Sequence, residues 1–469
     1  MRLRDQLFKQ RQRAQAPELA NPDAESVLAE AIKRQAGERV PSGDEGARIE
    51  ELPEWTPFEA HLAVNARGSF IRRRRVYPLD HVHGHARLGD LLGFAEVLEQ
   101  VAVKPGGKAG TKPSRQDGAH PVQDPNGEEQ GPPLYERMLF LDTETTGLGV
   151  GAGNVPFMVG IGYFRQQAFI VDQMLIRNPA EERAMLHELD SMLASYTHLV
   201  TYNGRTFDWP VVRNRFVMHR MAVSGLDRFA HLDFLYPSRS LYRKTLPTCR
   251  LSMVEERRLG VYRHEDVPGS LAPELYVKYL AEQEPAILEG VFRHNEWDIL
   301  TLNLLAAHFA ALAAGTMPFR SLEATEVFRA GVWFENQGMQ ARADAAYAYL
   351  LELHPEERRG LQLELAQVLK KKGALQAAVQ LWEESLQADD AASSDGIEAR
   401  VQLAMAYEHR LKDLSRALQV AEEAKELALR RMTLARGRDG GKQRAQLADL
   451  VKRVERLRRK AAASKEQTG

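Results

Sequence analysis

The chain has 469 residues, of which 44% are hydrophobic and 27% charged, so we expect a globular protein of two or three domains rather than a disordered or fibrous one. The formal net charge of −1 gives no whole-chain sign of nucleic-acid binding, so any basic surface must be local. One cysteine, Cys249, excludes an intrachain disulfide framework. Because no apolar run reaches about 18 residues and the charged N-terminus lacks a signal peptide, we expect a cytoplasmic protein outside the membrane.

The first part of the chain alternates between polar and patterned stretches. Residues 1–51 are polar, with few aromatic side chains, and we expect a loosely ordered arm. Residues 52–103 form an accessory segment in which a turn at Gly68 leads into a strand that ends near Tyr77. Residues 104–133 are so rich in glycine, proline and charge that they cannot bury enough apolar surface to fold, which predicts a flexible linker.

Strands and helices alternate in residues 134–318. A short apolar run, Met138-Leu139-Phe140-Leu141, predicts a buried strand, and VPFMVGIGYF and QAFIVDQMLI predict two more in an antiparallel meander. The segment HLVTYN predicts a fourth strand. Helices are expected over 180–195, 209–222, 249–260 and 285–314. This order predicts an α/β fold with a mixed sheet flanked by helices.

The composition changes again after residue 322, where alanine, leucine and glutamate dominate and strand signals nearly vanish. Gly338 and Gly373 mark the same turn in an imperfect repeat of about 35 residues, close to the tetratricopeptide period. We therefore expect TPR-like helical repeats over 322–435, which suit a protein partner. Residues 436–469 form a basic tail, expected to be a solvated or frayed helix.

The sharpest chemical signal is the pair Asp142 and Glu144 at the end of an apolar strand. Residues two apart on a strand face the same side, so these carboxylates lie next to each other. Such a pair repels unless a cation lies between its members, and hard oxygen ligands suit Mg²⁺ or Mn²⁺. The alternative from this pair alone is two solvated acids.

Two further elements supply acids later in the chain. Asp208 follows the strand HLVTYN and stands at the start of the next helix. The alternative for Asp208 is that it is merely the N-cap of this helix. His294 and Asp298 are four residues apart at the start of a long apolar helix and share one face. The alternative for this pair is a solvated helix face.

The order DTETTG, then N-x4-D, then an acid on a late helix resembles the DEDD exonuclease superfamily. The longer stretches LDTETTGLGVGAGNVPFMVGIGYF, VTYNGRTFDWPVVRNRF, HLDFLYPSRSLYR, CRLSMVEERRLG, EDVPG and FRHNEWDIL resemble the YprB-like ribonuclease H-fold family over about residues 52–315. The resemblance implies a ribonuclease H-like exonuclease domain over 134–318. It also implies two Mg²⁺ or Mn²⁺ ions, and metal-ligand roles for Asp142, Glu144, Asp208 and Asp298.

The same resemblance implies roles in a two-metal phosphodiester hydrolysis. Asp142 would bridge the ions, Glu144 and Asp298 would serve the nucleophile side, and Asp208 the leaving-group side. His294 is the fifth candidate catalytic residue, but the superfamily places either tyrosine four residues or histidine five residues before the last aspartate. His294 stands four before Asp298, so orienting the attacking water, capping the helix and contacting the scissile phosphate all stay open.

Candidate substrate contacts fall in two places. Thr145 and Asn203 adjoin the acidic motifs. A basic stretch, YPSRSLYRKTLPTCR, carries the other candidates, with Tyr236 and Tyr242 interleaved for base stacking: Arg239, Arg243, Lys244 and Arg250. The alternative is a solvated basic face.

Three other motifs have simpler interpretations. Only half of the run Arg72 to Arg75 can face one side of a strand. The alternating His81, His83 and His85 lack a fourth ligand for zinc, and Cys249 fits a small buried hydrophobic residue.

Two functions compete at this point. The first is a divalent-metal-dependent nuclease on DNA or RNA, with 3′–5′ exonuclease action. The second is a catalytically weak or inactive scaffold of the same fold that acts in protein–protein interaction through its repeats. The complete set of four acids favours the nuclease.

Overall fold

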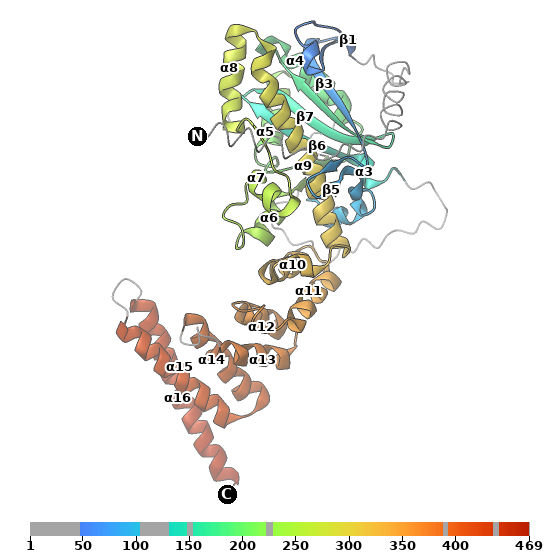
Figure 1. Ribbon diagram of the computed structural model, residues 1–469. Coiled ribbons are helices and arrows are strands. Elements are labelled where there is room, and N and C mark those ends of the chain that lie inside the picture. The colour runs from blue at the N-terminus through green and yellow to red at the C-terminus, as the bar shows by residue number, and fades with distance from the viewer. Residues whose placement is uncertain are drawn as a thin grey trace, which may run out of the picture.

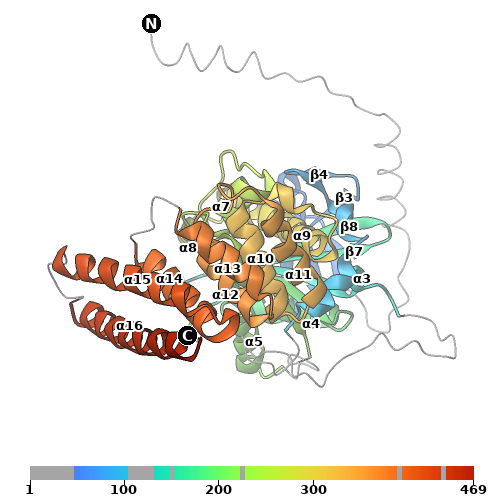
Figure 2. The same ribbon diagram turned by 90° about the horizontal axis from the view of Figure 1, so that it is seen from below.

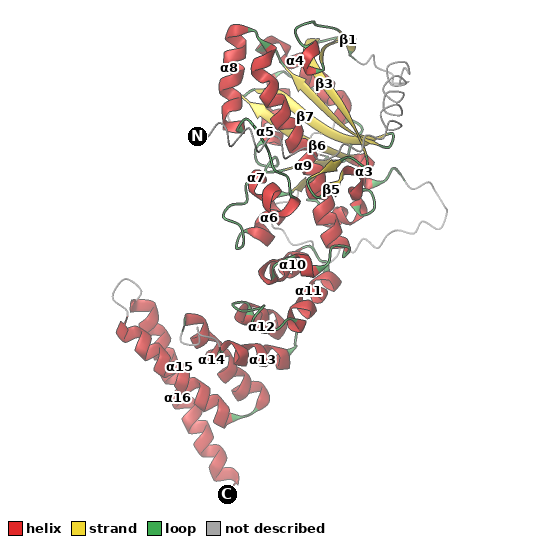
Figure 3. Cartoon of the chain, in the orientation of Figure 1, coloured by secondary structure: helices red, strands yellow, loops and turns green. Residues whose placement is uncertain are grey.

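The computed structural model describes residues 47–103, 131–147, 153–221, 228–387, 393–434 and 440–468. The expected arm (1–51) and linker (104–133) fall almost wholly outside these ranges. Figure 1 shows the described residues up to Ser321 as an α/β part, from which the residues after it lead away as a run of helices. In Figure 3 the strands are confined to the α/β part.

The α/β part is built on one mixed sheet of eight strands in the described residues. Its strands are β1 (Arg48–Glu50), β2 (Ala60–Asn65), β3 (Gly68–Pro78), β6 (Met138–Thr145), β7 (Pro156–Arg165), β8 (Ala168–Leu175), β9 (His198–Thr201) and β10 (Ala230–Asp233). The order is β1-β2-β3-β8-β7-β6-β9-β10, and only β6–β9 and β9–β10 are parallel pairs. The predicted mixed sheet and its antiparallel meander are confirmed.

The stretch 52–103 is part of this sheet rather than a separate segment, because β3 pairs with β8 over eight consecutive residue pairs. The arginine run on β3 explains the attachment. Arg72 and Arg74 form ion pairs with the buried Asp172. Arg73 and Arg75 point to the other face and pair with Glu296. The alternation of a strand therefore distributes the four arginines between two buried carboxylates.

Helices cover both faces of the sheet. They are α3 (Leu134–Arg137), α4 (Glu182–Leu193), α5 (Asp208–Met218), α6 (Leu235–Tyr242), α7 (Leu251–Val254), α8 (Ala272–Glu282) and α9 (Glu289–Ala314). Leu139 and Leu141 of β6 pack with the α4, α5 and α8 side, whereas Met138 and Phe140 pack with the α9 side. Asp142 and Glu144 continue the second alternation and so lie on the α9 face.

Short elements complete the α/β part. They are the hairpin β4 (Val82–His83) and β5 (Ala86–Arg87), the π-helical turn η5 (Glu255–Leu259), and the 3-10 turns η1 (Thr56–Phe58), η2 (Leu88–Leu91), η3 (Ala95–Gln100), η4 (Pro179–Glu181), η6 (Gly269–Leu271), η7 (Pro285–Leu288) and η8 (Phe319–Ser321). The stretch Pro285–Ala314 is the one helical stretch of the described residues that is long and apolar enough to cross a membrane. Because 72% of its most apolar window is buried inside the molecule, it has the character of a core helix.

The helical part consists of antiparallel pairs. Its helices are α10 (Ala324–Asn336), α11 (Gln340–Glu352), α12 (Gln362–Lys371), α13 (Leu375–Ser385), α14 (Ser394–Ala406), α15 (Leu414–Leu434) and α16 (Gly440–Thr468), with a π-helical turn η9 (Tyr407–Leu411). Gly338, Gly373 and Lys412 all adopt positive φ, at the turns of three successive pairs. The predicted all-helical C-terminal region is confirmed, and Figure 2 shows α15 and α16 side by side.

The expectation of a solvated or frayed tail is wrong for α16. Leu450, Val454 and Leu457 of this helix are buried. Spacings of three and four residues place these apolar side chains on one face, which packs against α14 and α15, so the basic residues occupy the remaining surface.

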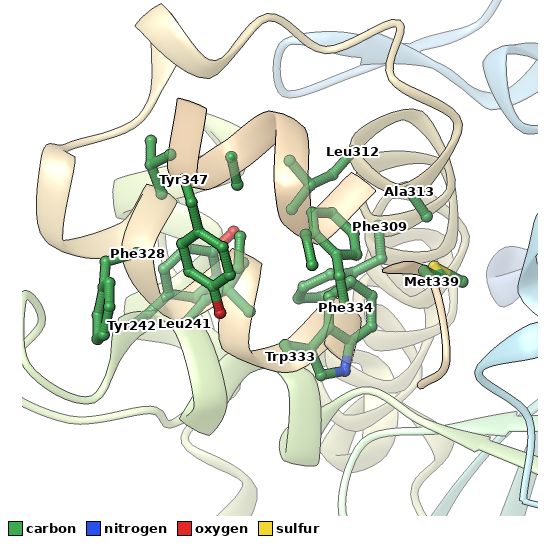
Figure 4. Packing of buried hydrophobic residues seen from close by; sticks show 14 of the residues in the cluster. Leu241, Tyr242, Phe309, Leu312, Ala313, Phe328, Trp333, Phe334, Met339 and Tyr347 are labelled. Carbon is green, nitrogen blue, oxygen red and sulfur yellow. The ribbon is translucent and has the colours of Figure 1, made fainter. Parts of the chain in front are cut away.

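The α/β part and the helical part share one hydrophobic core. Figure 4 shows this junction, to which α6, α9, α10 and α11 contribute the buried side chains Leu241, Tyr242, Phe309, Leu312, Ala313, Phe328, Trp333, Phe334 and Tyr347. The rings of Phe309 and Trp333 lie 5.8 Å apart, edge to face. No break in the core therefore accompanies the change of composition at residue 322.

Candidate active site

The strand β6 brings the first two acids to the α9 face of the sheet. Asp142 pairs with Gly160 of β7 in the sheet register, and a β-bulge follows between Glu144 and Thr145. Glu144 is only 7% exposed. A Cβ at residue 160 would collide with the side chain of Asn295, so only glycine lets α9 approach the strand this closely.

The third acid stands at the start of α5, directly after the turn that follows β9. Asp233 of β10 fixes this turn, because its carboxylate accepts the backbone N–H groups of Asn203 (2.8 Å) and Arg205 (3.0 Å). Asp208 is the first residue of α5 rather than its N-cap, which is Phe207. Its carboxylate accepts a hydrogen bond from the Thr143 hydroxyl at 2.5 Å, so α5 is joined to β6 at this point.

The fourth acid and the histidine lie one turn apart on α9. His294 Nε2 is 3.7 Å from Asp298 Oδ2. His294 Nδ1 lies 2.9 and 3.0 Å from the two carboxylate oxygens of Asp266. Asp298 also forms an ion pair with Arg263, which holds Glu255 at 2.9 Å through its Nε.

The charges of Asp298, Asp208 and Glu144 all act on Asp142, so the four acids lie near one another. Burial raises the pKa of Asp142 well above its usual range, and the charges of Asp298, Asp208 and Glu144 raise it further. Burial likewise raises the pKa of Glu144 to about 8 and that of Asp208 to about 6. Carboxylates from β6, α5 and α9 thus repel one another across a shared space, which is what a bound cation relieves.

The donor chemistry of these residues fits divalent metal ions, since all four are carboxylates in mutual repulsion. No three His, Cys, Asp or Glu side chains among the described residues, however, are already arranged as a set of metal ligands. Two of the four acids already have other partners. Arg263 neutralises Asp298, and Thr143 turns one oxygen of Asp208 toward itself.

A buried chain of hydrogen bonds orients Asp142. Arg73 donates to Gln173 Oε1 at 2.7 Å, and Gln173 Nε2 donates to Asn295 Oδ1 at 2.9 Å. Asn295 Nδ2 must then face Asp142, whose Oδ2 it meets at 2.9 Å. The charge of the arginine therefore sets the direction of both amides, and the last amide donates to the acid.

Sequence reasoning assigned no role to three residues that contact the candidate acids or His294, namely Asn295, Asp266 and Arg263, or to Glu255, which pairs with Arg263. Asn295 stands inside the motif FRHNEWDIL, and Asp266 stands inside EDVPG, so both were within the stretches that carry the family resemblance. Arg263 lies outside these stretches, and Glu255 stands inside another of them, CRLSMVEERRLG. The contact of Arg263 with Asp298 joins residues 35 positions apart, and Glu255 lies in a π-helical turn. Neither feature can be recognised from the local sequence.

The candidate substrate residues divide into three groups. The Thr145 hydroxyl donates to the Gly147 carbonyl at 2.7 Å, and Asn203 Oδ1 accepts from Thr206, so both side chains stabilise turns. Arg239 and Arg243 are exposed on and just after α6. Lys244 instead forms an ion pair at 2.8 Å with Glu364 of α12.

The expectation that Tyr242 stacks on bases is wrong. Its side chain is fully buried in the junction, and its hydroxyl lies 2.6 Å from His308 Nε2. Tyr236 of the same helix is partly exposed. The helical period of α6 explains the difference, because Leu241 and Tyr242 fall on the face that packs against α9 and α10.

The remaining motifs have structural contacts. His83 Nε2 lies 3.2 Å from the Thr301 hydroxyl, and burial lowers the pKa of His83 to about 4. Cys249 packs beside the core, and burial raises the pKa of its thiol. Neither observation adds a chemical function to these residues.

Two comparisons with known proteins found similarity to this chain. The model of the RNase_H superfamily matches residues 139–310, which run from β6 to α9 and include all four acids. The uncharacterized protein YprB of Bacillus subtilis (strain 168) is 31% identical over 392 residues, covering 82% of this chain and 88% of the Bacillus protein.

Proposed function

This chain belongs to the family of the Bacillus protein YprB, in the RNase H superfamily, and from that premise we propose that it is a nuclease that hydrolyses phosphodiester bonds with divalent metal ions. We propose further that it acts as a 3′–5′ exonuclease. The observation that carries the proposal is the meeting of four mutually repelling carboxylates from β6, α5 and α9 at one buried site.

Asp142, Glu144, Asp208 and Asp298 would hold two Mg²⁺ or Mn²⁺ ions, the kind of cofactor that RNase H-like nucleases generally use. Such ions neutralise charge on the phosphate and make a bound water more acidic. The protein contributes the orientation of the ligands. Asn295 Nδ2 donates to Asp142 Oδ2 at 2.9 Å and so fixes the orientation of this carboxylate.

His294 would act on the attacking water. Its Nε2 is on the side of Asp298, and its charge acts on Glu144, so the ring borders the space between the acids. A group in this place orients the water or accepts its proton. Arg239 and Arg243, exposed on and just after α6, would bind the phosphates of the substrate strand.

A second candidate is a scaffold of the same fold with weak or no activity, which acts through its helical repeats. The observation that favours it is the ion pair between Arg263 and Asp298, because an internal cation on one of the four acids competes with a metal ion. Release of Arg263 toward Glu255 and Asp266, both already its partners, would remove this obstacle.

One experiment decides between the two. The full-length protein is incubated with Mn²⁺, with Mg²⁺ or with EDTA, on single- and double-stranded DNA and RNA labelled at the 5′ end. We expect metal-dependent shortening from the 3′ end and no cleavage of a circular single strand. Hydrolysis of the circle would replace exonuclease action by endonuclease action. Inactivity on every substrate would favour the scaffold.

A further inference from the structure

We propose that Asp266 is the positioning residue of His294, so that a carboxylate–histidine pair forms part of the active site. This inference rests on the proposed nuclease function. It concerns the loop between η5 and η6, to which the sequence analysis assigned no chemical role.

The contacts of the imidazole define its orientation. The Nδ1 of His294 lies 2.9 and 3.0 Å from the two oxygens of Asp266 and 3.3 Å from Arg263 Nη1. Because the carboxylate oxygens are nearer and only accept hydrogen bonds, Nδ1 donates to Asp266 and carries a proton. The opposite nitrogen, Nε2, is then the one that faces Asp298, at 3.7 Å. The partner of one ring nitrogen thus determines which nitrogen meets the acids.

The loop that carries Asp266 is held from several sides. Arg263 Nη1 lies 3.2 Å from Asp266 Oδ2, and the same guanidinium is anchored to Glu255. The carbonyl of Glu265 accepts a hydrogen bond from Arg293 of α9 at 2.9 Å. The carboxylate of Asp266 is therefore held in place and can fix the orientation of the His294 imidazole.

Backbone packing also restricts the ring on its other side. A Cβ at Gly269 would lie 3.0 Å from His294 Nε2, so the loop backbone passes directly beside this nitrogen. A Cβ at Gly290 would collide with Val267, which shows that the loop sits on the first turn of α9. The imidazole therefore lies between the loop and the acids, with little freedom to turn over.

The position of Asp266, and not only its charge, therefore fixes the orientation of the His294 imidazole. Without it, the ring of His294 can turn over, and Nε2 is then no longer held on the side of Asp298. Asparagine at residue 266 is the informative change. Its side chain nearly keeps the volume but replaces one carboxylate oxygen by an N–H donor, which cannot accept the hydrogen bond of Nδ1.

Asp266 also contacts Arg263, so a loss of activity in Asp266→Asn needs a test of its route. A double-mutant cycle with His294→Ala supplies it. If Asp266 acts through the imidazole, its replacement has no further effect once the imidazole is gone. If it acts through Arg263, the two losses multiply.

The experiment compares the wild type, Asp266→Asn, His294→Ala and the double variant in full-length form, with Glu265→Gln as the matched control from the same loop. We expect Asp266→Asn to lower kcat by about 10–100-fold, with KM and Mn²⁺ affinity nearly unchanged. We expect the double variant to match His294→Ala. NMR of the ¹⁵N-labelled imidazoles should show that the Nδ1 proton of His294 is lost or moved only in Asp266→Asn.

Two results would overturn the inference while the proposed function survives. One is an active Asp266→Asn variant with an unchanged His294 spectrum. The other is multiplying losses in the cycle. A wild type without hydrolysis overturns the proposed function itself, and the catalytic use of the pair fails with it.

Discussion

The two halves of α9 do opposite work. Its N-terminal half carries His294, Asn295 and Asp298, each engaged in polar contacts with other elements. Its C-terminal half carries Phe309 and Leu312, buried among the side chains of α6 and α10. A single continuous helix therefore joins the acids to the junction with the helical part.

The surroundings of the two halves contribute to the free energy of folding with opposite signs. The N-terminal half lies beside Asp142 and Glu144 of β6, and burial and neighbouring acids raise the pKa of both carboxyls, so their ionised forms oppose folding of the metal-free protein. At the C-terminal half, burial of large apolar side chains favours folding. We infer that the apolar half supplies the rigidity with which the polar half is held in an unfavourable arrangement.

The largest effect should come from breaking the apolar half. Removal of residues 322–469 would expose Phe309, Leu312, Leu241 and Tyr242, which α10 and α11 now cover. We expect this fragment to be insoluble or unfolded. A fragment ending at residue 353 keeps both covering helices, and we expect it to stay folded with a lower Tm. Circular dichroism and size-exclusion chromatography of both fragments test this, and a soluble, cooperatively folded 1–321 fragment would contradict it.

Breaking the polar half should instead remove activity and leave the fold. We expect Asp142→Asn to reduce hydrolysis to the level of the reaction without protein. In EDTA at neutral pH its stability should hold or rise, because the change removes a buried charge that three other acids repel. Tm and hydrolysis are measured on the same preparation. Activity equal to the wild type would refute the assignment of Asp142, and a large fall in Tm would refute the energetic argument.

The same comparison explains what the sequence could predict. Asp142 and Glu144 were predictable because the alternation of one strand sets their side, and His294 with Asp298 because of the helical spacing. The hydrogen-bond chain to Asp142 was not, since Asn295 lies 153 positions away from its partner. Local pattern determines which residues share a face, whereas the fold determines which faces meet.

The contacts of Tyr242 and Lys244 could not be predicted for the same reason. In the basic stretch, the sequence shows residue types but not which of them face the helical part. Tyr242 fell on the apolar face of α6, and Lys244 met Glu364 of α12. Both contacts join the α/β part to the helical part. No local pattern in α6 predicts where the helical part packs.

A smaller effect concerns the pH dependence of the metal-free protein. Burial and neighbouring acids raise the pKa of Glu144 to about 8, and burial, partly offset by hydrogen bonds, raises that of Asp208 to about 6. In unfolded chains carboxyls titrate near 4. The native state thus binds more protons than the unfolded state between about pH 4 and pH 8, so stability falls as pH rises through this window.

His294 contributes with the same sign. Burial alone would lower its pKa, but the hydrogen bond to Asp266 and the charges of Asp298 and Glu144 raise it to about 9. This stabilisation is present below the unfolded value near 6.5 and is lost as pH rises through about 9. We expect Tm in EDTA to fall from pH 5 to pH 9, and Mn²⁺ to reduce the fall. A flat profile in EDTA would contradict the crowding of the acids, and Glu144→Gln should flatten the profile partly.

The smallest effect separates two neighbouring cations that the sequence treats alike. Arg243 is exposed, whereas the ammonium of Lys244 is paired with Glu364 on the helical part. Loss of one phosphate contact lowers the slope of log affinity against log salt by about 0.7 for a single strand. We expect Arg243→Ala to lower the slope by about this amount. Lys244→Ala should leave the slope nearly unchanged and cost at most about 1 kcal/mol of stability, as exposed ion pairs do. Affinity for a single-stranded oligonucleotide is measured with Asp142→Asn as the common background, so that no substrate is consumed.

If Lys244→Ala also lowers the slope, Lys244 exchanges Glu364 for phosphate, and the edge of the helical part then borders the path of the substrate. If neither variant changes the slope, the strand does not pass along this side of α6, and Arg239, on the same helix, would lose its proposed role as well.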